Sequence, residues 1–557
     1  MGKYLLTVLL LPFFGGLCQE PANRASFKWF EYKGHDPVYQ SHPLTGGQFH
    51  NPILQGFYPD PSICRKKGND YYMVHSTFSF YPGVPIFHSR DLVHWEQIGH
   101  VLDRPSQLNL DGLPISYGIF APAIEYNPYN DTFYMVTTLV GGGGNFVVKA
   151  KDPQGPWSDP VWLPDVPGID PSLFFDDDGR AYIVNNREPA YAPIYSGHRA
   201  VWVHEYDIAT DQTIGTPKVL IDGGIDIRTE PQWIEGPHLY KVNGWYYLMA
   251  AEGGTSINHS EVILRSQSPW GPFEAWEGNP ILTQRDLPAN RPYPVTNAGH
   301  ADLIQMHDGS WWAVFLACRP YEANLFNIGR ETFLLPVQWH NGWPTILDKG
   351  LPIPATVHKP GLAKPTETQW MPNGNFTIRD DFDSGCLDLS WVFIRTPRTQ
   401  WYRLEDGNLD LTCEPVSISE LKNPAFIGRR QQHHWFEVSA RMDFQPKASE
   451  NAGLVCFQNE NNFYYLGVHK KGKRTVARLT KGIKGAQREV LAEIPIRKSP
   501  HTDLKIVGKG ACIDFWVSTR QGKWRTVASG IDARHLSTDH AGGFVGTIIG
   551  MYASSTE

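Results

Sequence analysis

The chain contains few cysteines, no large excess of charge of one sign, and no apolar stretch long enough to cross a membrane. Six of its seven cysteines are scattered over the residues after 18, with no CxxC pair and no Cys/His spacing, which excludes a disulfide framework and a zinc module. Acidic and basic side chains number 57 and 50 and leave a net charge of −7, whereas a general nucleic-acid binder needs a basic face. Only 19% of the residues are charged and 41% are hydrophobic, so a packed core is expected and wholesale disorder is excluded.

The first residues have the pattern of a signal peptide. Lys3 supplies the positive end and residues 4–14 form the apolar stretch. A segment with small residues, as found before a cleavage site, follows and ends at Cys18. We therefore predict a signal peptide over residues 1–18 and export of the protein to the periplasm or the medium. A lipid anchor on Cys18 is the alternative, which the bulky Leu17 before it disfavours.

Aromatic residues are abundant and recur in a pattern. They make up 13% of the chain, beside 52 glycines and 44 prolines, which is typical of many short strands joined by turns. A unit of turn, paired aromatics and apolar strand occurs five times, in residues 68–74, 130–136, 178–184, 243–249 and 308–314. A repeat of roughly 50–65 residues fits one four-stranded blade with a variable loop and predicts a five-bladed β-propeller.

Two changes of pattern divide the chain. The propeller is predicted for residues 45–350, and prolines that cluster without periodicity mark a linker over 351–374. Residues 375–557 alternate apolar and polar side chains with no helical period, which predicts an antiparallel β-sandwich of the concanavalin or lectin-like type. The predicted fold class is therefore all-β, a five-bladed β-propeller followed by a β-sandwich, with little helix.

Three acidic residues occur in turn-like settings at comparable blade positions. Asp60 and Asp170 each begin an Asp-Pro-Ser-aliphatic unit, and Glu235 begins Glu-Gly-Pro-His. Equivalent positions of different blades converge on the central channel of a propeller. Mutual repulsion would keep one carboxyl protonated, so that it can act as a general acid, while an ionised carboxylate activates water. Glycoside hydrolysis requires these two groups. A lone Asp before Pro is more often a turn cap, but two copies together with Glu235 favour the functional interpretation.

Several short segments, in their order and spacing, resemble glycoside hydrolase family 43, in particular its two-domain β-xylosidases and α-L-arabinofuranosidases. These segments are residues 58–63, 80–84, 91–95, 169–179, 234–238, 251–255, 299–302 and 329–332. The resemblance implies an inverting mechanism in which Asp60 is the general base, Glu235 the general acid, and Asp170 the residue that tunes the pKa of Glu235 and helps to hold the sugar. Inversion needs a water molecule between base and sugar, so the acid and the base should lie about 6.5–9.5 Å apart.

The resemblance also suggests substrate-binding residues. Arg319, in Ala-Cys-Arg-Pro, matches a family arginine that hydrogen-bonds the terminal sugar. His300, in Gly-His-Ala-Asp, matches a channel histidine that many members associate with a hydrated calcium ion. A single histidine supplies few ligands for calcium, which prefers several oxygen ligands. The competing interpretation is that His300 is a buried core histidine. No cofactor is expected for the chemistry, and a structural calcium that His300 holds through water is the metal site suggested. Four aromatic residues are candidate pocket walls: Phe78, Phe80, Tyr81 and Phe120.

Two departures from the family pattern bear on the choice of sugar. Phe120 stands where many relatives have Trp, which keeps an aromatic wall but changes the width of the pocket. Many β-xylosidases of this kind insert an aromatic residue of the sandwich just before a Gly-x-Phe-Val-Gly segment. Residues 542–546 have that pattern here, and His540 occupies the place of the aromatic residue. Either His540 fills this part of the site or the sandwich does not close the pocket, and both departures favour an arabinofuranosidase over a xylosidase.

The sequence thus predicts an exo-acting, inverting glycosidase that releases non-reducing terminal α-L-arabinofuranosyl residues from plant cell-wall hemicellulose oligosaccharides, with terminal β-D-xylosyl residues as an additional candidate substrate. A β-D-xylosidase acting on xylo-oligosaccharides and an endo-acting arabinanase or xylanase are the enzymatic alternatives. The alternative of another class is a non-catalytic carbohydrate-binding protein, since propellers and sandwiches both serve as lectins. The expected partner is the oligosaccharide substrate, with no nucleic acid and no membrane span.

Overall fold

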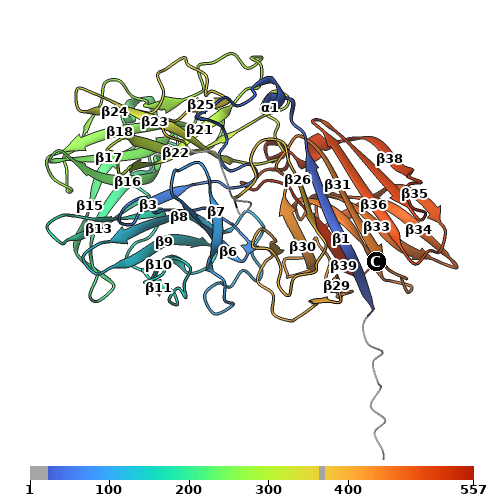
Figure 1. Ribbon diagram of the computed structural model, residues 1–557. Helices are drawn as coiled ribbons and strands as arrows, with labels where there is room; N and C mark the ends of the chain where they lie inside the picture. Colours follow the sequence, from blue (N-terminus) through green and yellow to red (C-terminus); the bar gives the residue numbers. More distant parts are fainter. Residues whose placement is uncertain (1–22, 363–369, 557) are drawn as a thin grey trace, which may run out of the picture.

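The computed structural model describes residues 23–362 and 370–556. A propeller and a β-sandwich lie side by side (Figure 1). The predicted signal peptide, residues 1–18, and part of the predicted linker lie outside the described residues, so export stays a prediction. Within the described residues, no helix is long and apolar enough to cross a membrane.

Five antiparallel sheets, each contiguous in the sequence, form the propeller. Blade 1 contains β3 (Ser62–Arg65), β4 (Tyr71–Val74), β6 (Gly83–Ser89) and β7 (Glu96–Leu102). Blade 2 contains β8 (Gly118–Asn127), β9 (Thr132–Val140), β10 (Gly144–Ala150) and β11 (Val161–Trp162). Blade 3 contains β12 (Ile169–Phe175), β13 (Ala181–Arg187), β14 (Ala200–Asp207) and β15 (Gln212–Asp222). Blade 4 contains β16 (Glu235–Val242), β17 (Trp245–Glu252), β18 (Ser260–Ser266), β19 (Glu274–Ala275) and β20 (Leu282–Thr283). Blade 5 contains β21 (Thr296–Gln305), β22 (Trp311–Cys318), β23 (Glu331–His340) and β24 (Trp343–Thr345).

Each of the five turn-and-aromatic repeats leads into the second strand of a blade: β4, β9, β13, β17 and β22. The aromatic and aliphatic side chains of these strands are largely buried between neighbouring blades. Because the repeat is the structural unit itself, the predicted five-bladed propeller is confirmed.

The innermost segment of every blade changes direction at one residue with a positive φ. These residues are Asp60 (51°), Ala121 (37°), Asp170 (53°), Gly236 (56°) and His300 (50°). In blades 2 to 5 the pairing with the second strand shifts at this point, so each inner strand has a bulge that turns the backbone toward the channel. All five residues border a small space at the centre of the ring.

The chain closes the ring with residues that precede the first blade. Leu54 bridges Thr332 on β23, and Asn51 donates its backbone N–H to the carbonyl of Ala355 at 2.9 Å. A short sheet of β2 (Gln48–His50) and β25 (Thr356–His358) continues this contact. The first and last blades are therefore held together by backbone pairing.

The sandwich contains two antiparallel sheets that face each other across an apolar core. In order, the eight-stranded sheet contains β28 (Tyr402–Glu405), β29 (Asn408–Thr412), β1 (Arg24–Gly34), β31 (Trp435–Asp443), β36 (Thr502–Lys509), β37 (Cys512–Ser518) and β38 (Arg525–Asp532), with β26 (Thr377–Asp380) also paired to β1. The six-stranded sheet contains β30 (Ala425–Arg430), β39 (Ile548–Ser554), β32 (Asn451–Asn459), β33 (Asn462–Lys471), β34 (Arg474–Ile483) and β35 (Gln487–Ile496). This confirms the predicted sandwich.

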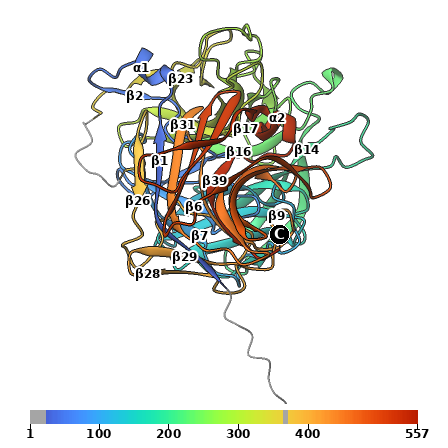
Figure 2. The same ribbon diagram turned by 90° about the vertical axis from the view of Figure 1, so that its right-hand side faces the viewer.

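Strand β1 is a feature that the sequence pattern did not reveal. It lies inside the eight-stranded sheet, between β29 and β31 (Figure 2), although it precedes the propeller in the sequence. Phe27 and Phe30 place their rings in the sandwich core, where both are almost fully buried. The sandwich is therefore built from both ends of the described chain.

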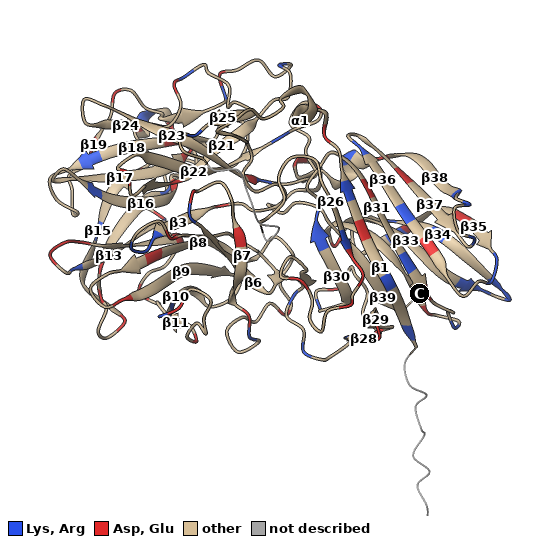
Figure 3. Ribbon diagram, in the orientation of Figure 1, with Lys and Arg blue, Asp and Glu red and all other residues tan. Residues whose placement is uncertain are grey.

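The two domains share an extensive interface. Strand β5 (Phe80–Tyr81), from blade 1, pairs with β27 (Phe393–Ile394) of the sandwich. Arg430 on β30 donates from Nε to the carbonyl of Phe57 at 2.6 Å, and an apolar cluster contains residues of both domains. Lys, Arg, Asp and Glu are interspersed over both domains (Figure 3).

Helix and disulfides contribute little to the fold. The helices are α1 (Pro37–Ser41), α2 (Thr538–Ala541) and two 3₁₀ turns, Ile227–Thr229 and Ala533–Leu536. Among the described residues no disulfide is formed; four cysteines are buried and two, Cys386 and Cys512, are exposed. Packing of strands therefore carries the stability of the described fold.

Candidate active site

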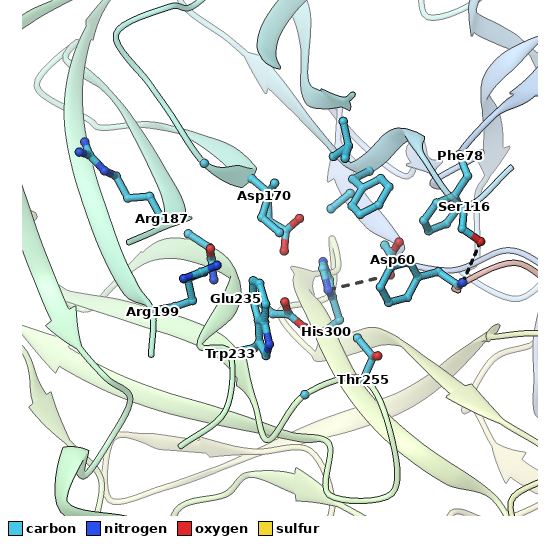
Figure 4. A pocket seen from close by; sticks show the side chains of 18 of the residues that line it. Asp60, Phe78, Ser116, Asp170, Arg187, Arg199, Trp233, Glu235, Thr255 and His300 are labelled. Atoms are coloured by element: carbon cyan, nitrogen blue, oxygen red, sulfur yellow. Dashed lines mark hydrogen bonds and ion pairs between the residues drawn. The ribbon is translucent and has the colours of Figure 1, made fainter. Parts of the chain in front are cut away.

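A cavity of about 590 Å³ opens at one end of the propeller channel, and the three predicted carboxylates line it. Figure 4 shows Asp60, Asp170 and Glu235 pointing into this one pocket from three different blades. All three are buried, with 5 to 7% of their surface exposed. Their convergence is what the sequence predicted.

The three carboxylates do not occupy strictly equivalent positions. Asp60 and Asp170 are the positive-φ residues of their blades, whereas in blade 4 that residue is Gly236. Glu235 therefore lies one residue earlier in its blade than Asp60 and Asp170 do in theirs. Its side chain is also longer by one methylene group, which lets the carboxyl reach the same cavity.

Asp60 has a cationic partner on the pocket wall. Arg330, just before β23, donates from Nη1 to Oδ1 of Asp60 at 2.8 Å, and both side chains are buried. Nδ1 of His300 lies 3.9 Å from the same oxygen. Burial lowers the pKa of His300 to about 4, so near neutral pH the ring is neutral and Arg330 supplies the positive charge.

Asp170 and Glu235 form a coupled acidic pair. Oδ2 of Asp170 accepts the backbone N–H of Gly236 at 3.2 Å. Burial, with the nearby charge of Asp60, raises the pKa of Asp170 to about 7. Burial and the charge of Asp170 raise the pKa of Glu235 well above its usual range. Of the two, Glu235 retains the proton, because the Gly236 N–H stabilises the ionised form of Asp170.

Three phenylalanines form one wall of the pocket. Phe78 and Phe120 lie there as predicted, and Phe544 joins them from the sandwich. The rings of Phe78 and Phe544 stack with centroids 5.9 Å apart, and Phe120 meets Phe544 edge-on at 5.7 Å. The backbone N–H of Phe544 is held by Oγ of Ser116 at 3.1 Å.

The predictions for the sandwich residue and for two of the wall residues need correction. His540 lies in α2 beside His535, 6.2 Å between centroids, and is absent from the pocket lining. Phe544, inside the Gly-Gly-Phe-Val-Gly segment itself, is the residue that enters. Phe80 and Tyr81 belong to β5 and pack in apolar clusters behind the wall.

Arg319 does not reach the sugar pocket. Its guanidinium binds both oxygens of Glu331, at 2.6 and 2.9 Å, and Oδ2 of Asp36 at 3.0 Å. These buried carboxylates draw the side chain toward the interface with the sandwich. Of the two arginines that flank this loop of blade 5, Arg330 is the one that lines the pocket, and its segment, Gly-Arg-Glu-Thr, was among those that resemble the family.

The surroundings of His300 offer little room and few ligands for a calcium ion. Below the catalytic cavity, the space at the channel centre has a volume of about 10 Å³, which is room for one water molecule. Among residues 23–362 and 370–556, no three His, Cys, Asp or Glu side chains converge as metal ligands. The residues here do not fit a hydrated calcium ion, and no step below depends on one.

Asp302 has a structural role. Its Oδ2 accepts Ser62 Oγ at 2.8 Å and the Ile63 N–H at 2.9 Å, and its Oδ1 accepts Tyr240 Oη at 2.7 Å. The carboxylate thus ties blade 5 to blades 1 and 4 just below Asp60. A further set of pocket residues, on blades 3 and 4, was not predicted from the sequence: Asn186, Arg187, Glu188, Arg199 and Trp233.

Comparison with known proteins places this geometry in a family. The family model described as "Glycosyl hydrolases family 43" matches residues 49–344. The model described as "Beta xylosidase C-terminal Concanavalin A-like domain" matches residues 379–557. A xylosidase/arabinosidase of Butyrivibrio fibrisolvens is 43% identical over 520 residues, 91% of this chain and 95% of that protein. A non-reducing end alpha-L-arabinofuranosidase of Bacteroides ovatus is 38% identical over 520 residues, 92% of each chain.

A solved structure is similar over nearly the whole chain. The crystal structure of a GH43_12 protein retrieved from a capybara gut metagenome has a TM-score of 0.90 and 44% identity, and the match covers 96% of this chain and 100% of that one. The chain belongs to glycosyl hydrolase family 43 and is a glycosidase.

Proposed function

We propose that the protein is an exo-acting, inverting glycosidase that releases non-reducing terminal α-L-arabinofuranosyl residues from hemicellulose oligosaccharides. The observation that carries the proposal is the arrangement of three buried carboxyls in one cavity, with the raised pKa of Glu235 on one side and the Arg330–Asp60 pair on the other. A lectin does not need a protonated acid facing a separate carboxylate, so this arrangement supports turnover.

In the proposed reaction, Glu235 donates its proton to the glycosidic oxygen as the bond to the anomeric carbon breaks. Asp60 takes a proton from a water molecule, and the water oxygen bonds to the anomeric carbon from the opposite face. The sugar leaves with one new hydroxyl, the aglycone leaves with the proton of Glu235, and no covalent enzyme intermediate forms. Asp170 keeps Glu235 protonated beforehand, because its charge raises the pKa of that carboxyl.

Two features support exo action. The phenylalanine wall includes a residue of the sandwich, so the cavity is closed on that side by the second domain. Its volume of about 590 Å³ lies within the range for sites that hold one small molecule, roughly 300–1,000 Å³. Such a pocket suits one terminal sugar with its immediate neighbour better than an internal chain segment.

A β-D-xylosidase is the second candidate, and Phe544 favours it. The preference for arabinose rested partly on the absence of a sandwich aromatic from the pocket, and Phe544 removes that reason. Phe120 in place of Trp remains as the residue that favours arabinose, and relatives carry both names. Both activities are therefore measured side by side.

The test compares the wild type with Glu235→Gln on aryl α-L-arabinofuranoside and aryl β-D-xyloside. Loss of the general acid should lower kcat by about 10²–10⁴-fold on a poor leaving group and by less on dinitrophenyl, which needs no protonation. NMR of the first anomer released should show β-arabinose from the α-linked donor. Unchanged turnover of Glu235→Gln, or first release of α-arabinose, contradicts the mechanism, and binding without turnover in the wild type identifies a lectin.

A further inference from the structure

The side of the pocket beyond Glu235 has chemistry that glycosidic bond cleavage does not use. Figure 4 shows Arg187 and Arg199 on the far side of Glu235 from Asp60 and Phe78, with Trp233 beside Glu235. Since Glu235 would protonate the leaving oxygen, the departing part of the substrate lies on its side of the pocket. These residues therefore face the aglycone, whereas the phenylalanine wall faces the sugar that is released.

Arg187 places a guanidinium on this side of the pocket. It ends β13 and lies over Trp202, with 4.1 Å between the guanidinium carbon and the ring centroid. Among the described residues no side chain forms an ion pair with Arg187, and its guanidinium donates no hydrogen bond to them. Gly168 makes room for it, because a Cβ on residue 168 would come within 2.7 Å of the Arg187 Cβ. The donors of Arg187 thus lie at the pocket without a hydrogen-bond partner among the described residues.

Arg199 provides a second guanidinium from the same hairpin of blade 3. It lies 4.2 Å over Trp233, and its Nη1 donates to the carbonyl of His198 at 3.2 Å. Its acidic neighbour is Glu188, 3.7 Å away and 71% exposed, a separation and exposure at which an ion pair contributes little. Trp233 is held at a φ of 51°, which a bulky residue rarely adopts without a functional constraint.

We propose that Arg187 and Arg199 form an aglycone subsite for the carboxylate of a uronic acid residue. Planar guanidiniums bind carboxylates through paired N–H donors, and stacking on Trp202 and Trp233 fixes their orientation before the substrate arrives. The two arginines and the one solvent-exposed carboxylate near them leave this side of the pocket with a net positive charge, although the catalytic centre is acidic. The substrate class is therefore an arabinofuranosylated oligosaccharide that carries glucuronic acid close to the bond that is cleaved.

This inference rests on the proposed function, and the competing interpretation is that the two arginines bind sugar hydroxyls. The two interpretations differ in their dependence on charge. A matched pair of substrates separates them: an arabinofuranosylated xylo-oligosaccharide carrying glucuronic acid, and the same oligosaccharide after reduction of that carboxyl to an alcohol. Release of arabinose from each is measured as kcat/KM at low salt and at 0.5 M NaCl, where exposed charges are largely screened.

The wild type should prefer the acidic substrate by about tenfold in kcat/KM, as expected for one charge-assisted bidentate contact, and salt should reduce this preference. Arg187→Gln and Arg199→Gln should each lower the ratio of acidic to reduced substrate. Arg187→Lys, which keeps the charge but not the paired donors, should retain part of it. Arg228→Gln is the matched control, because Arg228 is 86% exposed and pairs with Asp226 outside the pocket lining; it should leave the ratio unchanged.

Equal kcat/KM values for the two substrates in the wild type overturn the inference. A preference that survives Arg187→Gln and Arg199→Gln does the same. If the wild type does not cleave aryl α-L-arabinofuranoside at all, the proposed function has failed, and that result is separate from the comparison of acidic and reduced substrates.

Discussion

At the scale of single residues, the site depends on how negative charge is distributed among three buried carboxyls. Asp170 is the residue through which this can be tested, because its charge raises the pKa of Glu235. Asp170→Asn keeps an oxygen acceptor for the Gly236 N–H and removes the charge. The pKa of Glu235 should then fall. Since activity requires Glu235 protonated, the alkaline loss of kcat/KM should begin at a lower pH than in the wild type.

The measurement is a pH profile of kcat/KM on an aryl glycoside, recorded for Asp170→Asn and for Asp177→Asn. Asp177 carries an exposed carboxylate on the same blade, where it pairs with Lys241, and its loss should leave the alkaline limb in place. An alkaline limb that does not move in Asp170→Asn, or that moves upward, would show that Asp170 does not hold the proton on Glu235.

The sequence predicted Asp60, Asp170 and Glu235 because each lies in a local turn motif whose blade position can be read from the repeat. It did not distinguish Arg319 from Arg330. These residues flank one loop of blade 5, and which of them enters the pocket depends on Asp36, a buried carboxylate from the segment after β1. A partner separated by nearly the whole propeller in sequence leaves no local pattern.

At the scale of elements, the positive-φ residue at each bulge sets the geometry of the site. Gly236 is the most constrained of them, because a Cβ there would lie 2.8–3.0 Å from the ring of His300. Gly236→Ala should therefore displace His300 and Glu235 together. We expect a fall in kcat/KM of about 10–100-fold, since displacement of a catalytic group by about 1 Å has effects of that size.

Gly309→Ala is the matched control for backbone strain. Gly309 has a φ of 86°, and nothing lies within 4 Å of the position of its Cβ. Both variants should lose about 1–2 kcal/mol of unfolding free energy from the left-handed conformation, measured by urea titration. Only Gly236→Ala should lose activity; equal kinetics of the two variants would show that the contact with His300 does not matter.

Element prediction succeeded where the signal was local and failed where pairing was long-range. The five second strands follow Asn-Asp, Asp-Gly or Asn-Gly turns, and every one was predicted from its own residues. Strand β1 was missed because its partners, β29 and β31, begin at Asn408 and Trp435. Its alternating pattern does not reveal which sheet it joins.

At the scale of the whole molecule, the sandwich is part of the catalytic pocket. Phe544 reaches the wall from a loop between α2 and β39, and its position depends on the packing of the two domains against each other. The sequence motif placed the contribution of the sandwich near residues 540–546, but it did not identify the residue, because the direction of a loop side chain is set by the opposing surface. Here that surface includes Ser116 and Phe78 of the propeller.

Removing this ring should affect catalysis more than folding. Phe544→Ala takes away one face of the pocket and its contacts with Phe78 and Phe120, so we expect kcat/KM on aryl glycosides to fall about tenfold, chiefly through KM. The melting temperature should change little, because Phe544 is only partly buried. His540→Ala, four residues away and outside the pocket lining, should keep wild-type kinetics. If instead His540→Ala impairs turnover and Phe544→Ala does not, the sandwich contributes to the site through a different residue, and the closed wall on which exo action rests is wrong.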